Sequence, residues 1–95
     1  MNPETLLKNS IMNWLKSAYP GIMIMKLADK FSSGYPDLIL IHKNWGTCFV
    51  ELKAKKGRIS RIQEYMLNKI NQSGGKATVI RSIEELTSWL TFISE

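Results

Sequence analysis

The sequence predicts an α/β domain in which helices flank a central mixed sheet, in the order helix, three strands, helix, strand, helix. Three segments whose apolar residues recur at intervals of three and four predict helices, and two short apolar runs joined by a turn predict a hairpin. Since a chain of 95 residues holds one hydrophobic core, we expect a single domain over 1–95. Any activity must then come from one compact site per subunit.

The first helix is predicted to begin at Asn2-Pro3-Glu4, because Asn2 suits an N-cap and Pro3 suits the first turn. Its apolar face is formed by Leu7, Ile11, Trp14, Leu15 and Ala18. Tyr19-Pro20-Gly21 ends it. At about 100° per residue, Glu4 projects into the middle of this apolar face. An acid in that position requires an explanation.

Three strands follow, the first over Ile22–Leu27 and separated from the second by a loop over 28–36. Leu38–Ile41 is apolar without alternation, which favours a strand covered on both faces in the middle of the sheet. A turn over 43–46 leads into a return strand over Thr47–Lys53. The open end of this hairpin therefore lies beside residue 37.

The second half of the chain consists of a basic link over 54–59, a helix from Ser60 to Gly74-Gly75, a strand over Ala77–Ile80 and a last helix that begins at Ser82. The pairs Ser60/Gln63 and Ser82/Glu85 both have the spacing of a capping box. We therefore expect each serine to begin its helix with a reciprocal pair of hydrogen bonds.

The composition excludes several classes of protein. Apolar runs of four residues are far shorter than the roughly 20 of a membrane span, and the N-terminus lacks the apolar core of a signal peptide. We therefore expect a cytoplasmic protein with no membrane partner. One cysteine, Cys48, excludes an intramolecular disulfide and an all-cysteine zinc site. His42 and Cys48, on opposite arms of the hairpin, are interpreted as structural.

The candidate catalytic residues lie at the open end of the predicted hairpin. Glu51 and Lys53 share one face of their strand, and the hairpin places Asp37 beside them. The repulsion between two converging carboxylates is best relieved by a divalent cation, and oxygen ligands favour Mg²⁺ or Mn²⁺ over zinc. The backbone carbonyl of Leu52 offers another oxygen.

Lys53 would then lie beside the hydration shell of the ion. From there its ammonium group can orient a water molecule, or help to deprotonate it, for attack on phosphorus. The residues themselves thus favour hydrolysis of a phosphodiester bond.

The motif Gly34-Tyr35-Pro36-Asp37, followed by Glu51-Leu52-Lys53 and Gln63, resembles the PD-(D/E)xK nuclease signature. More narrowly, the segments SGYPDLIL, FVELKAKKGRISRIQ and GGKATVI, with the acid Glu4, are similar to the virus-type replication-repair nuclease domain, VRR-NUC. The resemblance implies a restriction-endonuclease-like fold and metal-dependent cleavage of DNA. It also implies a homodimer in many cases, acting on branched DNA such as four-way junctions.

The resemblance further implies roles for individual residues. Asp37 and Glu51 match the metal-binding acids, Lys53 the catalytic lysine, Gln63 the helix glutamine beside the site, and Glu4 the first-helix acid that approaches the metal.

A cluster of cations predicts contact with phosphates. Five basic residues fall within nine positions without an acid among them: Lys53, Lys55, Lys56, Arg58 and Arg61. Such contacts provide affinity but read no base sequence. Lys30 and Ser33 could extend the same surface, and Tyr35 either stacks on DNA or packs within its loop.

Each of these residues also has a structural interpretation. Asp37 could cap a turn, and Glu51 with Lys53 could be an exposed pair on an edge strand. Gln63 could serve only to close the capping box, and Glu4 could serve only to favour the helix dipole. For Asp37, Glu51 and Lys53 we prefer the catalytic interpretation, because the hairpin brings all three residues to the same end.

Two alternatives to a structure-selective endonuclease remain open. One is a non-catalytic, basic nucleic-acid-binding module, and the other is a restriction-type enzyme that reads a short sequence. A homodimer would present two sites for two strands. The large apolar residues that could form its interface are Met12, Trp14, Trp45, Trp89 and Phe92.

Overall fold

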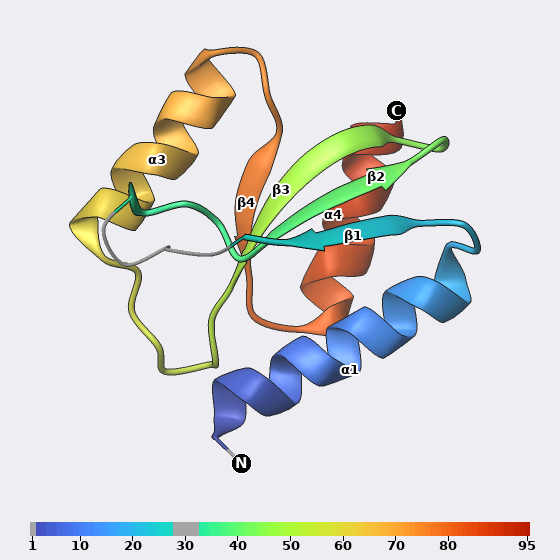
Figure 1. Cartoon of the computed structure of the whole chain (residues 1–95), viewed down its shortest axis with the longest axis horizontal. Helices are drawn as coiled ribbons and strands as arrows, with labels where there is room; N and C mark the ends of the chain where they lie inside the picture. Colours follow the sequence, from blue (N-terminus) through green and yellow to red (C-terminus); the bar gives the residue numbers. More distant parts are fainter. Residues whose placement is uncertain (1, 28–32) are drawn as a thin grey trace.

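The computed structural model describes residues 2–27 and 33–95, and it confirms the predicted α/β class and the order of the elements (Figure 1). The elements are α1 (Pro3–Ala18), β1 (Met23–Lys26), β2 (Leu38–His42), β3 (Gly46–Leu52), α3 (Arg61–Gln72), β4 (Ala77–Ile80) and α4 (Ile83–Ser94). Within the described residues, no helix is long and apolar enough to cross a membrane.

The four strands form one mixed sheet in the order β1-β2-β3-β4. β2 is antiparallel to both β1 and β3, whereas β3 and β4 run parallel. In the hairpin, Leu38 pairs with Val50, so continuing the register by one step sets Asp37 opposite Glu51. The open end of the hairpin therefore has an acid on each strand.

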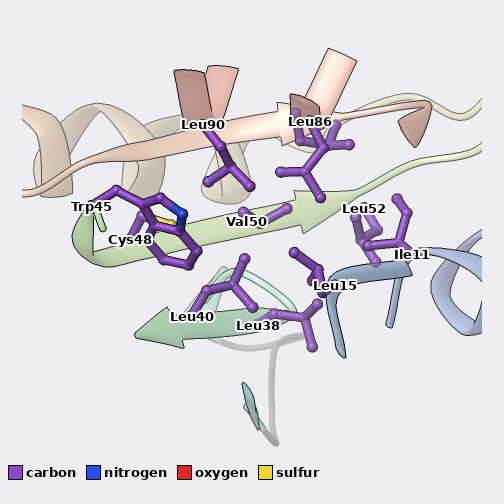
Figure 2. Packing of buried hydrophobic residues seen from close by; sticks show 11 residues of the cluster. Ile11, Leu15, Leu38, Leu40, Trp45, Cys48, Val50, Leu52, Leu86 and Leu90 are labelled. Carbon is purple, nitrogen blue, oxygen red and sulfur yellow. The ribbon is translucent and has the colours of Figure 1, made fainter. Parts of the chain in front are cut away.

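The hydrophobic core lies on one face of the sheet, which α1 and α4 cover, while α3 packs on the opposite side (Figure 1). Figure 2 shows the side chains that meet in this core: Ile11 and Leu15 from α1, Leu38 and Leu40 from β2, Val50 and Leu52 from β3, and Leu86 and Leu90 from α4. All eight are fully buried. Their packing fixes how α1 lies against the sheet, and with it the position of its first turn.

Several local predictions need correction. The first strand spans Met23–Lys26 rather than Ile22–Leu27, because the N–H of Ile22 already donates to the carbonyl of Tyr19 in the preceding turn. The return strand spans Gly46–Leu52 rather than Thr47–Lys53.

The prediction that β2 is covered on both faces was wrong for one face. β2 does lie inside the sheet, and Leu38 and Leu40 are fully buried. Ile39 and Ile41, on the face toward α3, are only half-buried. The core proper therefore lies on one side of the sheet.

The two capping boxes differ. Ser60 and Gln63 form the complete reciprocal pair. Ser82 accepts from the N–H of Glu85, but the Glu85 carboxylate accepts from the N–H of Arg81 instead of returning to Ser82. The second box is thus only half formed.

Candidate active site

Three carboxylates from three distant parts of the sequence meet at the open end of the hairpin. Glu4 lies in the first turn of α1, Asp37 directly before β2, and Glu51 near the end of β3. One oxygen of each lies within 4.8 Å of one oxygen of each of the others. The structure thus brings together the two predicted metal-binding acids and the predicted first-helix acid.

Local structure explains how Glu4 reaches this position. Asn2 caps α1 by accepting from the N–H of Thr5 at 2.8 Å, and Pro3 occupies the first helical position. Because Ile11 and Leu15 anchor the same helix in the core, the acid on that face turns toward the sheet at its N-terminal end. Glu4 therefore contributes to the carboxylate cluster whatever it contributes to the helix dipole.

The two hairpin acids are almost completely buried, with exposed fractions of 3% for Asp37 and 1% for Glu51. Burying ionised carboxylates is costly unless they are paired or hydrogen-bonded. Asp37 is held by the backbone N–H of Leu52, which donates to its Oδ2 at 2.8 Å. This bond takes the place of the next backbone hydrogen bond between β2 and β3, so the Asp37 side chain ends the pairing of the two strands.

Glu51 has two further partners through its Oε2 atom. The side-chain amide of Gln63 donates to it at 3.2 Å, and the ammonium nitrogen of Lys53 lies 3.5 Å away. Lys53 is itself largely buried, with a side chain 13% exposed. The interpretation of Glu51 and Lys53 as an exposed surface pair therefore does not describe this arrangement.

Gln63 makes both the capping contact and a contact with the carboxylate cluster. Its Oε1 accepts from the N–H of Ser60 at 2.9 Å and completes the capping box, while its Nε2 donates to Glu51. The amide thus links the start of α3 to the carboxylate cluster. A glutamine serves both contacts because its amide group carries one acceptor and one pair of donors.

The donor set fits a hard divalent cation. Two ligands of one Mg²⁺ ion lie at most about 4.2 Å apart, close to the spacing of the three carboxylates. Oε1 of Glu4 is buried and has no hydrogen-bond partner among the described residues, as expected for a ligand atom. The carbonyl of Leu52 points to the β2 side with its own N–H, since both groups of a strand residue face the same neighbour.

The predicted DNA-binding residues differ in exposure. Four cations are exposed in the link and at the start of α3: Lys55, Lys56, Arg58 and Arg61. Tyr35 is 47% exposed, and its N–H donates to the hydroxyl of Ser33 at 3.3 Å. Lys30 lies outside the described residues.

Sequence reasoning missed Arg81. Its Nη1 donates to the carbonyls of Ala54 and Gly57, at 2.7 Å each. No local sequence signal marks this arginine, because its partners lie more than twenty residues away and the contact depends on the parallel pairing of β3 with β4.

His42 and Cys48 have structural surroundings. The His42 Nδ1 accepts from the N–H of Asn44 at 3.1 Å, and its Nε2 lies 3.2 Å from the carbonyl of Pro20. Burial raises the pKa of the Cys48 thiol to about 12, although the nearby charge of Lys76 acts in the opposite direction. Neither residue is arranged as an activated nucleophile.

Comparison with known proteins agrees with the geometry of the site. Among proteins with curated descriptions, no significant relative was found. Among the solved structures that share the fold are two VRR-NUC domains. A VRR-NUC domain aligns with a TM-score of 0.79 at 20% identity, covering 96% of this chain and 97% of the other. A VRR-NUC domain protein aligns with a TM-score of 0.72 at 22% identity, covering 98% and 88%.

The family model of the VRR-NUC domain matches residues 3–84. This match spans all three acids of the cluster, together with Lys53 and Gln63. The chain therefore belongs to the VRR-NUC domain family and is a nuclease-type domain.

Proposed function

We propose that this protein is a divalent-metal-dependent DNA endonuclease that hydrolyses phosphodiester bonds with Mg²⁺ or Mn²⁺. The observation that carries the proposal is the buried cluster of Glu4, Asp37 and Glu51, with Lys53 adjacent to it. Three clustered acids next to a lysine, at the end of a sheet, make a poor core but a good site for a cation and a phosphate.

The residues that would hold the cation are Asp37, Glu51, the carbonyl of Leu52 and Glu4. When bound, a divalent ion supplies Lewis-acid stabilisation of the charge that develops on the phosphate and lowers the pKa of a water molecule. Gln63 orients the Glu51 carboxylate through its hydrogen bond.

Lys53 has the position of a residue that acts on the attacking water. Its ammonium group, 3.5 Å from Glu51, can donate a hydrogen bond to a water or to a phosphate oxygen beside the cluster. The exposed cations Lys55, Lys56, Arg58 and Arg61 would bind flanking phosphates, with Ser33, Tyr35 and Lys30 extending the surface. Such contacts predict affinity that decreases strongly with salt.

We further propose that the enzyme acts as a homodimer on branched DNA such as four-way junctions. The described part of one chain holds one such carboxylate cluster, so cutting two strands symmetrically requires a second copy. Of the apolar residues expected at an interface, Phe92 is 71% exposed and supports this proposal, whereas Trp45 is 4% exposed and belongs to the core. Sedimentation that shows only monomer, together with full activity, would refute the dimer.

The test of the catalytic proposal uses purified protein with Mg²⁺, Mn²⁺ or EDTA on linear duplex, flap and four-way DNA. We expect cuts that require the metal and favour branched substrates. Asp37→Ala should abolish cutting, and Lys53→Ala should leave only a small residual rate that single-turnover measurements can follow. Lys43→Ala, at the exposed turn of the same hairpin, is the matched control and should cut normally.

The alternative functions give different results in the same assay. Binding without metal-dependent cuts in any substrate would indicate a nucleic-acid-binding module. Discrete fragments from plasmid DNA would indicate a restriction-type enzyme that reads a sequence. Cutting that survives Asp37→Ala would refute the assignment of the site.

A further inference from the structure

Arg81 connects the end of β4 to the basic link. Its Nη1 atom donates to the carbonyl oxygens of Ala54 and Gly57 at 2.7 Å each, and the carbonyl of Lys55 lies 3.5 Å away. The N–H of Gly57 also donates to the carbonyl of Ala54 at 2.9 Å, so these residues form a closed turn. One guanidinium nitrogen thus holds both ends of this turn.

The parallel pairing of β3 with β4 explains why Arg81 lies there. The N–H of Lys53 donates to the carbonyl of Ile80 at 3.1 Å, which continues the ladder one residue past β3. The residues that follow these two on their strands, Ala54 after β3 and Arg81 after β4, therefore leave the sheet side by side. At the end of β4, Ile80 thus binds the backbone of Lys53, and the next residue, Arg81, binds the turn that follows Lys53.

The turn held by Arg81 lies against the stem of Lys53. A β-carbon built at Gly57 would lie 3.6 Å from Cδ of Lys53, so the backbone of Gly57 passes close to the lysine side chain. The ammonium group at the other end of that side chain lies 3.5 Å from Glu51. The turn therefore lies between Arg81, from which its carbonyls accept hydrogen bonds, and the lysine stem, whose ammonium group reaches the carboxylate cluster.

We infer that Arg81 is a positioning residue for Lys53: by holding the Ala54–Gly57 turn, it confines the lysine stem so that the ammonium group stays beside the carboxylate cluster. This inference rests on the proposed nuclease function. It differs from a role in phosphate binding, because the guanidinium donates to the protein backbone. The hydrogen bonds are charge-assisted and partly buried, which makes them stronger than neutral ones.

The experiment measures single-turnover cleavage at saturating DNA and Mn²⁺ for wild type, Arg81→Met, Arg81→Lys, Lys53→Met and the double variant. A displacement of a catalytic group by about 1 Å can cost about 100-fold in rate, so we expect a loss of that order for Arg81→Met. Arg81→Lys should recover much of the rate, because one ammonium nitrogen can donate to the same two carbonyls. Lys43→Met is the control for the loss of one positive charge.

The double variant separates positioning from other roles. If Arg81 acts through Lys53, Arg81→Met should cause little further loss once Lys53 is already Met. Independent, multiplicative losses would overturn the inference. So would an Arg81→Met protein with a normal rate at saturation but weaker, less salt-dependent DNA binding, which would indicate a direct phosphate contact.

Two further measurements keep the test conclusive. Faster amide exchange at Gly57 in Arg81→Met than in wild type would show that the turn has loosened, and an unchanged rate would overturn the inference. If Arg81→Met does not fold, Arg81→Gln takes its place in the cycle with Lys53→Met, because its shorter, uncharged amide cannot keep both hydrogen bonds to the turn. A wild-type protein without metal-dependent cleavage would refute the proposed function, whereas wild-type cleavage with an unaffected Arg81→Met would refute only the role of Arg81.

Discussion

The two ends of the β2–β3 hairpin are built from the same two strands but differ in kind. At the turn, His42 and Trp45 are buried with Tyr19 in a cluster of rings whose centroids lie 5.2 to 5.7 Å apart. At the open end, Asp37 and Glu51 are buried just as completely, but as acids. The turn is stabilised by ring packing, whereas the open end concentrates like charges.

The difference shows which end is organised for function. The polar atoms of His42 are satisfied by nearby backbone groups, whereas the buried Nε1 of Trp45 has no hydrogen-bond partner among the described residues, so the turn depends on ring packing more than on polar contacts. The acids of the open end are held by the N–H of Leu52, by Lys53 and by Gln63 of α3. The repulsion among the three carboxylates, one of which comes from α1, is best relieved by a cation. A site of this kind lowers stability for the sake of binding, and substitutions at the two ends should therefore have different consequences.

Glu51→Gln should have the largest effect. Loss of a charged ligand should lower metal-supported cleavage on the order of a thousandfold or more, while the amide still accepts from Gln63 and preserves the fold. The metal-free variant should unfold at the same temperature as wild type or higher, because one of three repelling charges is gone. Mn²⁺ should raise the unfolding temperature of wild type but not of the variant.

The control for this comparison is Glu84→Gln, which neutralises an exposed acid in the first turn of α4. It should leave both cleavage and the Mn²⁺-dependent rise in unfolding temperature unchanged. An active Glu51→Gln protein would contradict the assignment of Glu51 as a ligand.

Gln63 should show the next largest effect, and its two contacts can be separated. Gln63→Glu keeps the acceptor for Ser60 but replaces the donor to Glu51 with a fourth acid, so cleavage should decrease by about 10- to 100-fold. Ser60→Ala removes only the cap, which should cost about 1 kcal/mol in the free energy of unfolding and spare the cleavage rate. Rates and denaturant unfolding of both variants test this division. Equal cleavage losses in the two variants would mean that Gln63 acts only through the helix.

One glycine with positive φ lies at each end of the hairpin, so substituting each by alanine compares the two ends directly. Gly34 (φ +73°) lies before Asp37, and a β-carbon there would lie 2.5 Å from the carbonyl oxygen of Ile62 in α3. Gly46 (φ +79°) lies at the turn, where no heavy atom within the described residues would lie within 4 Å. Gly46→Ala should thus cost about 1 kcal/mol from backbone strain alone.

Gly34→Ala should cost more, about 2 kcal/mol or above, because the strain is joined by a collision with backbone. The collision would displace the start of α3 together with Gln63, so cleavage should decrease as well, and chemical denaturation with rate measurements checks both effects. If both variants lost the same stability and neither lost activity, the contact between Gly34 and α3 would have no role in the site.

Much of this architecture could be predicted from the sequence because its signals are local. Apolar periodicity identified the helices, and the hairpin register set Asp37 opposite Glu51. The dual role of Gln63 could not be deduced, since its capping contact is local but its contact with Glu51 depends on where α3 packs. Arg81 depends on a parallel strand pairing, which no short-range pattern reveals. Glu85 was assigned to the wrong backbone N–H because adjacent donors compete for one carboxylate.

Cys48, next to the core side of the hairpin, should show the smallest effect. Burial favours its neutral thiol and raises the pKa from 9.0 to about 12, so a thiol reagent should fail to label the native protein between pH 7 and 9. Labelling should proceed rapidly in denaturant. Because the unfolded thiol ionises first, this group stabilises the fold fully below pH 9, and its contribution is lost as the pH rises toward about 12.

Labelling of native Cys48 at the rate of the unfolded protein would mean that this part of the hairpin opens readily. The contrast between a hairpin end that ring packing stabilises and an end where carboxylates cluster would then be wrong. Labelling that slows when Mn²⁺ is added would instead show that the cation stabilises the whole hairpin, because a ligand bound at one end suppresses opening only where the two ends unfold together.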